Sequence, residues 1–235
     1  MAGPTLLDTR SKLFLTLTSV FVTSLVVGDL IGGKLMGVPL FGQVHYLSVG
    51  FIPFPITFLL TDLLNEFYGK KAARTVTWVG FGMAVFTLVV VTVAGAAPWH
   101  PDTLQPGWTG LTPATFDAVF SSGRRILMAS MTAYVVAQLI DIAVFHKLKA
   151  LTKGKMLWLR ATGSTITSQL IDTIVIQSLV WSGTLDLSKL TNLVITSWVG
   201  KVIIAVVLTP GIYLGHVLVQ KTLGLTPLPP GGEAE

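Results

Sequence analysis

The chain of 235 residues contains no cysteine and few charged residues. The absence of cysteine excludes disulfides, thiolate catalysis and thiolate metal sites. Only 11% of the residues are charged, whereas a soluble domain carries about 25%. Hydrophobic residues make up 51% of the chain, and its mean hydropathy is +0.73. This composition predicts an integral membrane protein that contacts the lipid bilayer along most of its length.

The motifs of common enzymes are missing as well. The sequence has no Gly-rich phosphate loop, no HExxH motif and no nucleophile elbow. Its four histidines are scattered and form no metal-ligand cluster. We therefore expect no enzymatic activity, no metal and no cofactor. The net charge of +5 does not imply nucleic-acid binding, because the basic residues lie at the ends of apolar segments.

Six apolar segments are long enough to cross about 30 Å of hydrocarbon as helices. These transmembrane helices are expected at residues 12–31, 48–67, 72–94, 124–145, 157–181 and 190–218. No short basic leader with a cleavage site precedes the first of them, so no removable signal peptide is expected. The fold class predicted is an all-α membrane protein with one transmembrane domain at residues 12–221.

The segments outside the helices have their own signatures. Residues 1–11 are expected to be a cytoplasmic N-terminal tail, and the Pro/Gly-rich residues 222–235 a disordered C-terminal tail. Residues 32–47 are Gly-rich and predict an irregular or interfacial connection. Residues 95–123 form the longest polar connection. Pro210 lies within the last apolar segment, where proline is expected to kink a helix.

The distribution of lysine and arginine predicts the orientation. Eleven of these residues lie in the two tails and the two loops on the same side of the membrane, and four lie in the loops on the other side. Positive charge gathers on the cytoplasmic side of bacterial membrane proteins. We therefore expect both termini in the cytoplasm.

One stretch, FPITFLLTDLLNEFYGKKAAR from Phe54 to Arg74, combines membrane-grade apolarity with acidic side chains. It places Asp62, Asn65 and Glu66 close together on one predicted helix. Carboxylates at membrane depth are costly and usually functional. The alternative for Glu66 is a simple pairing with Lys70 one turn later.

A second polar signal is the sequence Gln-Leu-Ile-Asp, which occurs in two predicted helices. It comprises Gln138 to Asp141 and Gln169 to Asp172. Helical spacing places Tyr134 on the same face as Gln138 and Asp141. Each charged residue inside a membrane costs at least about 3 kcal/mol on insertion scales. These faces therefore predict a binding site, with structural helix–helix hydrogen bonds as the alternative.

The aspartates also suggest internal symmetry. Asp29 and Asp62 lie in the first two predicted helices, and Asp141 and Asp172 lie in the fourth and fifth. Their depths suit two three-helix halves that enter the membrane in opposite senses. We expect an inverted three-plus-three repeat with the site between its halves.

The sixth predicted helix adds Lys201, the one cation deep within an apolar segment. It needs an anionic partner, and the four aspartates are the candidates. Trp198 precedes Lys201 by one turn and is a candidate wall of the site. Pro53 and Pro55 free backbone groups at membrane depth, which predicts an opened helix beside the site.

Taken together, four stretches resemble the queuosine precursor transporter family, also known as the vitamin uptake transporters. They are FPITFLLTDLLNEFYGKKAAR, RILMASMTAYVVAQLIDIAVFHKLK, STITSQLIDTIVIQSLVW and WVGKVIIAVVLTPGIYL, and the resemblance itself covers nearly the whole chain. The resemblance implies a bacterial inner-membrane importer of 7-cyano-7-deazaguanine or 7-aminomethyl-7-deazaguanine. The polar positions that match the family pattern are Asp62, Asn65, Glu66, Gln138, Asp141, Gln169, Asp172 and Lys201. The chain departs from the pattern at Asp29, near which the family has asparagine.

Two other classes of protein share some of these features. A substrate-binding subunit of an energy-coupling transporter has similar size and helix number, although its small-residue docking surface is missing from residues 13–27. An intramembrane aspartyl enzyme would need a pair of aspartates, but no other enzyme signature accompanies them. A homodimer is an arrangement that the sequence leaves open.

Overall fold

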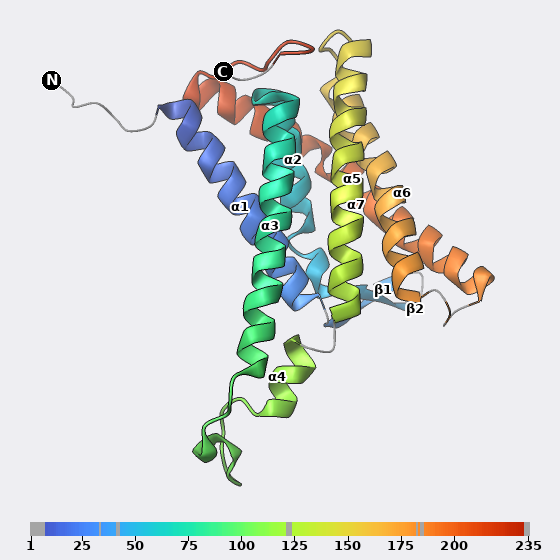
Figure 1. Cartoon of the computed structure of the whole chain (residues 1–235). Helices are drawn as coiled ribbons and strands as arrows, with labels where there is room; N and C mark the ends of the chain where they lie inside the picture. Colours follow the sequence, from blue (N-terminus) through green and yellow to red (C-terminus); the bar gives the residue numbers. More distant parts are fainter. Residues whose placement is uncertain are drawn as a thin grey trace, which may run out of the picture.

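The computed structural model describes residues 8–32, 34–40, 43–120, 124–181, 183 and 186–232. Residues 1–7 and 233–235, which belong to the two predicted tails, lie outside this description. Helices dominate the described residues, and one two-stranded antiparallel sheet accompanies them (Figure 1). The described part of the chain is that of a helical membrane protein.

The elements follow one another along the chain in a simple order. They are α1 (Thr9–Ile31), β1 (Leu35–Leu40), β2 (Gln43–Ser48), the 3-10 turn η1 (Val49–Phe51), α2 (Phe54–Phe67), α3 (Gly69–Ala96), the 3-10 turn η2 (Pro101–Leu104), α4 (Pro113–Phe120), α5 (Arg124–Leu151), α6 (Leu157–Trp181) and α7 (Leu187–Leu223).

Four helices of the described chain are long and apolar enough to cross a membrane. They are α1, α3, the Met128–Leu151 part of α5, and α7. Of the two other predicted crossings, α6 has the predicted bounds but carries many polar residues. The remaining one, α2, has 14 residues and reaches about 21 Å at 1.5 Å per residue.

One end of the bundle gathers the segments predicted to be cytoplasmic. The start of α1, the α2–α3 corner, the α5–α6 connection and the end of α7 all lie at the top in Figure 1. The helix α4 and the start of α7 lie toward the other end. With 37 residues, α7 is about 55 Å long and crosses the bundle at a steep tilt.

The structure corrects two expectations about connections. Residues 35–40 and 43–48 are not irregular, because β1 and β2 pair in antiparallel fashion, with Gly37 opposite Tyr46. The prolines do not open a helix in mid-span, because Pro53 is the N-cap of α2 and Pro55 lies in its first turn. Proline suits this position, where its missing N–H has no helical partner to lose. Pro210 lies inside α7, which continues through it as one helix.

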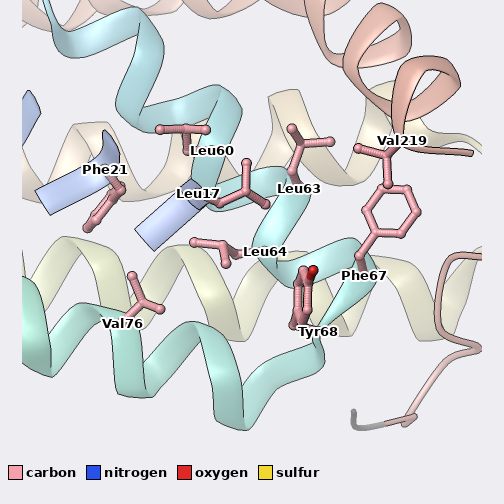
Figure 2. Close-up of a cluster of buried hydrophobic side chains, with 9 residues drawn as sticks. All are labelled: Leu17, Phe21, Leu60, Leu63, Leu64, Phe67, Tyr68, Val76 and Val219. Atoms are coloured by element: carbon pink, nitrogen blue, oxygen red, sulfur yellow. The ribbon is translucent and has the colours of Figure 1, made fainter. Parts of the chain in front are cut away.

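The C-terminal half of α2 is the centre of the bundle. Every residue of α2 from Leu60 to Phe67 is buried, polar side chains included. Figure 2 shows the apolar part of this core, in which Leu60, Leu64 and Phe67 of α2 lie among side chains of α1, α3 and α7. Because α2 is surrounded by other helices, its polar residues must find partners within the protein.

The corner between α2 and α3 fixes the position of this central helix. Gly69 has a φ of 84°, the left-handed conformation that glycine adopts at low cost. Next to it, the Tyr68 hydroxyl donates to the carbonyl of Arg10 at 2.7 Å, and Arg10 Nη2 donates to the Phe67 carbonyl at 2.6 Å. These reciprocal bonds attach the start of α1 to the end of α2.

Candidate functional site

Asp62 is the least satisfied polar group of the central helix. It is 2% exposed, and neither carboxylate oxygen has a hydrogen-bond partner among the described residues. A cavity of about 10 Å³, room for a single water, lies beside it and is lined also by Thr162 and Thr165 of α6. Buried polar groups are nearly always paired. An unpaired carboxyl at the centre of the bundle is therefore a candidate recognition group.

Two other buried polar atoms near the middle of the bundle are also unpaired within the described chain. They are Oε1 of Gln169 on α6 and Nδ2 of Asn65 on α2. The other amide atom of Asn65, Oδ1, lies 3.2 Å from Nε2 of His146 on α5. Together with Asp62, these residues offer three acceptor oxygens and one amide donor that nothing in the described chain uses.

The predicted face of α5 joins this region from the other side. Asp141 is buried and accepts a hydrogen bond of 3.1 Å from the Ser168 hydroxyl on α6. The carboxyl groups of Asp141 and Asp62 lie close enough to repel each other when both are charged. Gln138 Nε2 donates to the Thr61 hydroxyl at 2.9 Å, directly beside Asp62 along α2. The structure thus places three of the predicted site residues, Asp62, Gln138 and Asp141, in one region of the bundle.

Glu66 is not paired with Lys70, the alternative partner that its helical spacing offers. Arg160 on α6 donates to both of its carboxylate oxygens, from Nε at 3.1 Å and from Nη2 at 2.7 Å. Lys149 on α5 lies 3.2 Å from Oε2, and His216 on α7 lies 3.9 Å from Oε1. We call these four residues the Glu66 cluster.

Sequence reasoning missed Arg160 and Lys149, which it counted only as cations that set the orientation. Both are 2% exposed in the folded chain. A signal was present for Arg160, because it falls within a predicted helix at four-residue spacing from Ser164, Ser168 and Asp172. This spacing predicts one polar face along α6.

Lys201 has the acidic partner that the sequence required. Its Nζ donates to Oδ2 of Asp172 at 2.5 Å, and both side chains are largely buried. The ammonium also lies 5.1 Å from the centre of the Phe54 ring at the start of α2, where the ring face attracts a cation. This pair lies about 18 Å along α6 from Arg160, at 1.5 Å per residue.

The polar atoms of the remaining predicted residues serve contacts between helices. The Trp198 indole donates to the carbonyl of Ile166 at 3.0 Å and ties α7 to α6. The Tyr134 hydroxyl donates to the carbonyl of Thr77 at 3.2 Å and ties α5 to α3. Asp29 accepts from the Ser130 hydroxyl at 3.2 Å.

Fold and site together define a class of protein. The described residues contain no group of three side chains placed to hold a metal ion. Acidic and amide groups are instead buried between helices of a membrane bundle, as in small-solute transporters. The family model described as "Putative vitamin uptake transporter" matches residues 48–215, so the chain belongs to this family. It is a transporter, not an enzyme, and a multi-pass bacterial membrane protein.

Three curated relatives support this assignment. A protein of Bacillus subtilis (strain 168), named "Probable queuosine precursor transporter", is 26% identical over 74% of this chain and 73% of its own length. One of Haemophilus influenzae with the same name is 33% identical over 58% of this chain and 53% of its own. The "Queuosine precursor transporter" of Escherichia coli K12 is 28% identical over 53% and 51%. The matched stretch is thus about half of these last two proteins. No solved structure matches the chain.

Proposed function

We propose that this protein imports a queuosine precursor, a 7-deazaguanine base, across the bacterial inner membrane. The observation that carries the proposal is the buried carboxylate of Asp62, whose two oxygens have no partner in the described chain. Its three curated relatives are named as transporters or probable transporters of a queuosine precursor. The unpaired groups beside Asp62 suit the same ligand.

The chemistry of a deazaguanine matches this set of groups. Its ring N–H and adjacent exocyclic amine are parallel donors, which one carboxylate can accept as a pair of hydrogen bonds. Asp62 provides that carboxylate, and Gln169 Oε1 provides a further acceptor. The amide of Asn65 can donate to the carbonyl oxygen of the base. In the 7-aminomethyl form, the extra cation would find a second carboxylate in Asp141, beside Gln138.

Binding of a base requires the helices to separate. The cavity beside Asp62 has a volume of about 10 Å³, whereas small-molecule sites measure about 300–1,000 Å³. The apolar side chains of Phe58, Leu59 and Ile212 are among those that line this small cavity. The ligand therefore enters only when α2, α6 and α7 move relative to one another.

Two groups of ion pairs lie on either side of Asp62 and are proposed to act as gates. The Glu66 cluster joins α2, α5, α6 and α7 at the end where α2 meets α3. The pair of Asp172 and Lys201 joins α6 and α7 toward the opposite end. Asp172 and Lys201 would then line the transport pathway and contact the base as it passes. Glu66 would contact the base at the other gate, together with the rest of the Glu66 cluster. Tyr134 and Trp198 remain predicted walls of the pathway.

The arrangement in the membrane is part of the proposal. Six crossings with both termini in the cytoplasm agree with the distribution of lysine and arginine and with the helix ends that gather at one side (Figure 1). An inverted repeat would relate the first three crossings to the last three. Superposition of the two halves of an experimental structure after a two-fold rotation tests the repeat. Analytical ultracentrifugation in detergent tests the homodimer.

Uptake of labelled 7-cyano-7-deazaguanine tests the function directly. A strain that cannot make queuosine precursors is complemented with the wild type, with Asp62→Asn, or with the double variant Asp141→Ala and Asp172→Ala. Asp102→Asn is the matched control, because that carboxylate lies on an exposed turn. We expect uptake to be lost in Asp62→Asn and in the double variant, and to be kept in Asp102→Asn. Full uptake by Asp62→Asn at equal expression would refute the assignment of the site.

The alternative as a subunit of an energy-coupling transporter is tested by the host. If the chain alone restores uptake in a strain without the partner ATPases, it works as an independent carrier. If uptake appears only after those ATPases are supplied, the alternative is correct.

A further inference from the structure

A second pocket lies between the Glu66 cluster and the C-terminal tail, and its lining residues differ from those around Asp62. Its volume is about 500 Å³, within the range of about 300–1,000 Å³ typical of small-molecule sites. The segment Pro227–Pro230 covers one side. This segment is fixed to the bundle, because the backbone N–H of Leu228 donates to the carbonyl of Glu66 at 3.0 Å. The pocket is therefore a built feature of the fold.

The lining of this pocket carries more positive than negative charge. Lys149, Lys153 and Arg160 contribute cations, and Glu66 is the one carboxylate among the lining residues. Lys149 and Arg160 share that carboxylate although both are almost fully buried. No carboxylate of the described residues pairs with Lys153, which lies at the exposed rim. Buried charge that is left uncompensated is costly, so the pocket favours an anion.

Hydrogen-bond donors of the right kind face the same space. The long helix α6 begins at Leu157 in the pocket wall, so the positive end of its dipole lies beside the pocket and favours an anion there. The hydroxyl of Tyr213 accepts a bond of 3.4 Å from the backbone N–H of Trp158, which leaves its own proton free to donate. The ammonium group of Lys149 contacts the backbone carbonyl and the carboxylate of Glu66, and its third N–H can donate to a ligand.

We propose that this pocket binds a phosphate group, as carried by an anionic phospholipid headgroup or by a soluble phosphate compound. The surroundings suit a lipid. Met156, Trp158 and Tyr213 near the pocket are exposed, and tryptophan and tyrosine mark the membrane–water interface. Leu214 and Leu218 follow on the exposed surface of α7, where an acyl chain can lie. Basic pockets between helices on the cytoplasmic side are known to bind anionic headgroups.

The experiment uses the full-length protein purified in a neutral detergent. One arm titrates phosphatidylglycerol, with phosphatidylcholine as the zwitterionic comparison, and follows retained lipid by native mass spectrometry. A second arm titrates inorganic phosphate and follows the melting temperature. Lys153→Gln removes the rim cation at an exposed position, so folding is kept. Lys155→Gln is the matched control, because its side chain is exposed on the same loop and does not line the pocket.

Lys153→Gln is expected to weaken phosphatidylglycerol binding about fivefold, the effect of one basic residue near an anionic lipid. Lys155→Gln is expected to bind like the wild type. If inorganic phosphate instead shows this pattern and the lipid does not, the phosphate site stands and its source is soluble. Binding of neither probe would overturn the proposal. So would equal losses in both variants, which indicate diffuse surface attraction, or unchanged binding by Lys153→Gln. These measurements do not depend on uptake, so the transported solute is tested separately.

Discussion

Arg160 of α6 and Glu66 of α2, which lie 94 residues apart in sequence, are joined by two hydrogen bonds. The guanidinium matches both carboxylate oxygens, a geometry that lysine cannot reproduce. The remaining Nη1 of Arg160 donates to the carbonyls of Gly154 and Lys155, at 2.9 and 3.0 Å. One side chain therefore fixes the start of α6, the loop before it and the end of α2.

Removal of this arginine should strongly destabilise the protein. We expect Arg160→Ala to cost about 3–5 kcal/mol, the penalty for leaving one member of a buried ion pair without its partner. Unfolding in mixed micelles with increasing denaturing detergent measures the loss. The exposed pair of Lys189 and Asp186 is the control, and Lys189→Ala should cost less than about 1 kcal/mol. Similar losses in both variants would show that Lys149 alone satisfies Glu66.

Asp62 should be kept for function at the expense of stability. Asp62→Leu replaces an unpaired buried carboxyl by an apolar side chain with the same branching and number of heavy atoms, and we expect it to stabilise the fold by about 1–3 kcal/mol. The same variant should lose uptake, since the recognition group is gone. Melting temperature and uptake are measured on the same preparations. A lower melting temperature would mean that Asp62 has a stabilising partner after all.

The pair of Lys201 and Asp172 should show strong mutual dependence. Lys201→Met leaves the buried Asp172 without its cation, and Asp172→Asn leaves Lys201 without its anion. The double variant should recover about 1–3 kcal/mol of the summed losses, as for residues that share one interaction. A double-mutant cycle from equilibrium unfolding gives this coupling energy. Additive losses would indicate that the two side chains act independently, and then the gate assigned to them would be wrong.

Gly80 allows α3 to approach α5 closely. A Cβ at this position would lie 2.7 Å from the Tyr134 hydroxyl oxygen. We expect Gly80→Ala to destabilise the protein by about 1–3 kcal/mol through overpacking, and Tyr134→Phe in the same chain to restore part of the loss. Thermal unfolding in detergent measures both.

Gly82 provides the matched control on the same helix. A Cβ there would meet nothing within 4 Å, so Gly82→Ala should be neutral or stabilise by up to about 1 kcal/mol through helix propensity. If Gly80→Ala is also neutral, α3 and α5 have room to shift at this contact.

The positions of the long helices could be predicted from the sequence, because apolar length marks such segments, whereas α4 lies in residues 95–123, which were predicted to be a polar connection. The bounds of α6 agree with the prediction at both ends. The acidic partner of Lys201 was predictable as well, since a cation at membrane depth allows few alternatives. The strands β1 and β2 could not be predicted, because the pairing of two short strands is specified weakly by a Gly-rich segment.

The partners of Glu66 were the largest omission in the candidate site. Lys70 lies at helical spacing from Glu66 in the sequence, whereas Arg160 comes from a distant segment. Local spacing cannot show which buried cation a folded bundle brings to a carboxylate. The burial of Lys149 likewise depends on the packing of α2 against α5, which apolar periodicity does not determine.

The polar face of α6 has a mechanical consequence. From Arg160 to Asp172 the helix turns through twelve residues, so the two side chains point about 120° apart around its axis at 3.6 residues per turn. At each end of this helical segment an ion pair attaches a neighbouring helix: Arg160 holds α2, and Asp172 holds α7. A rotation of α6 about its own axis would break both attachments together and open a leak. A rocking motion about its middle, near Ser168, loosens one end while it presses the other closed. If the two ion pairs are the proposed gates, such rocking would admit solute from one side at a time, and the stiffness of one helix would be enough to couple its two ends.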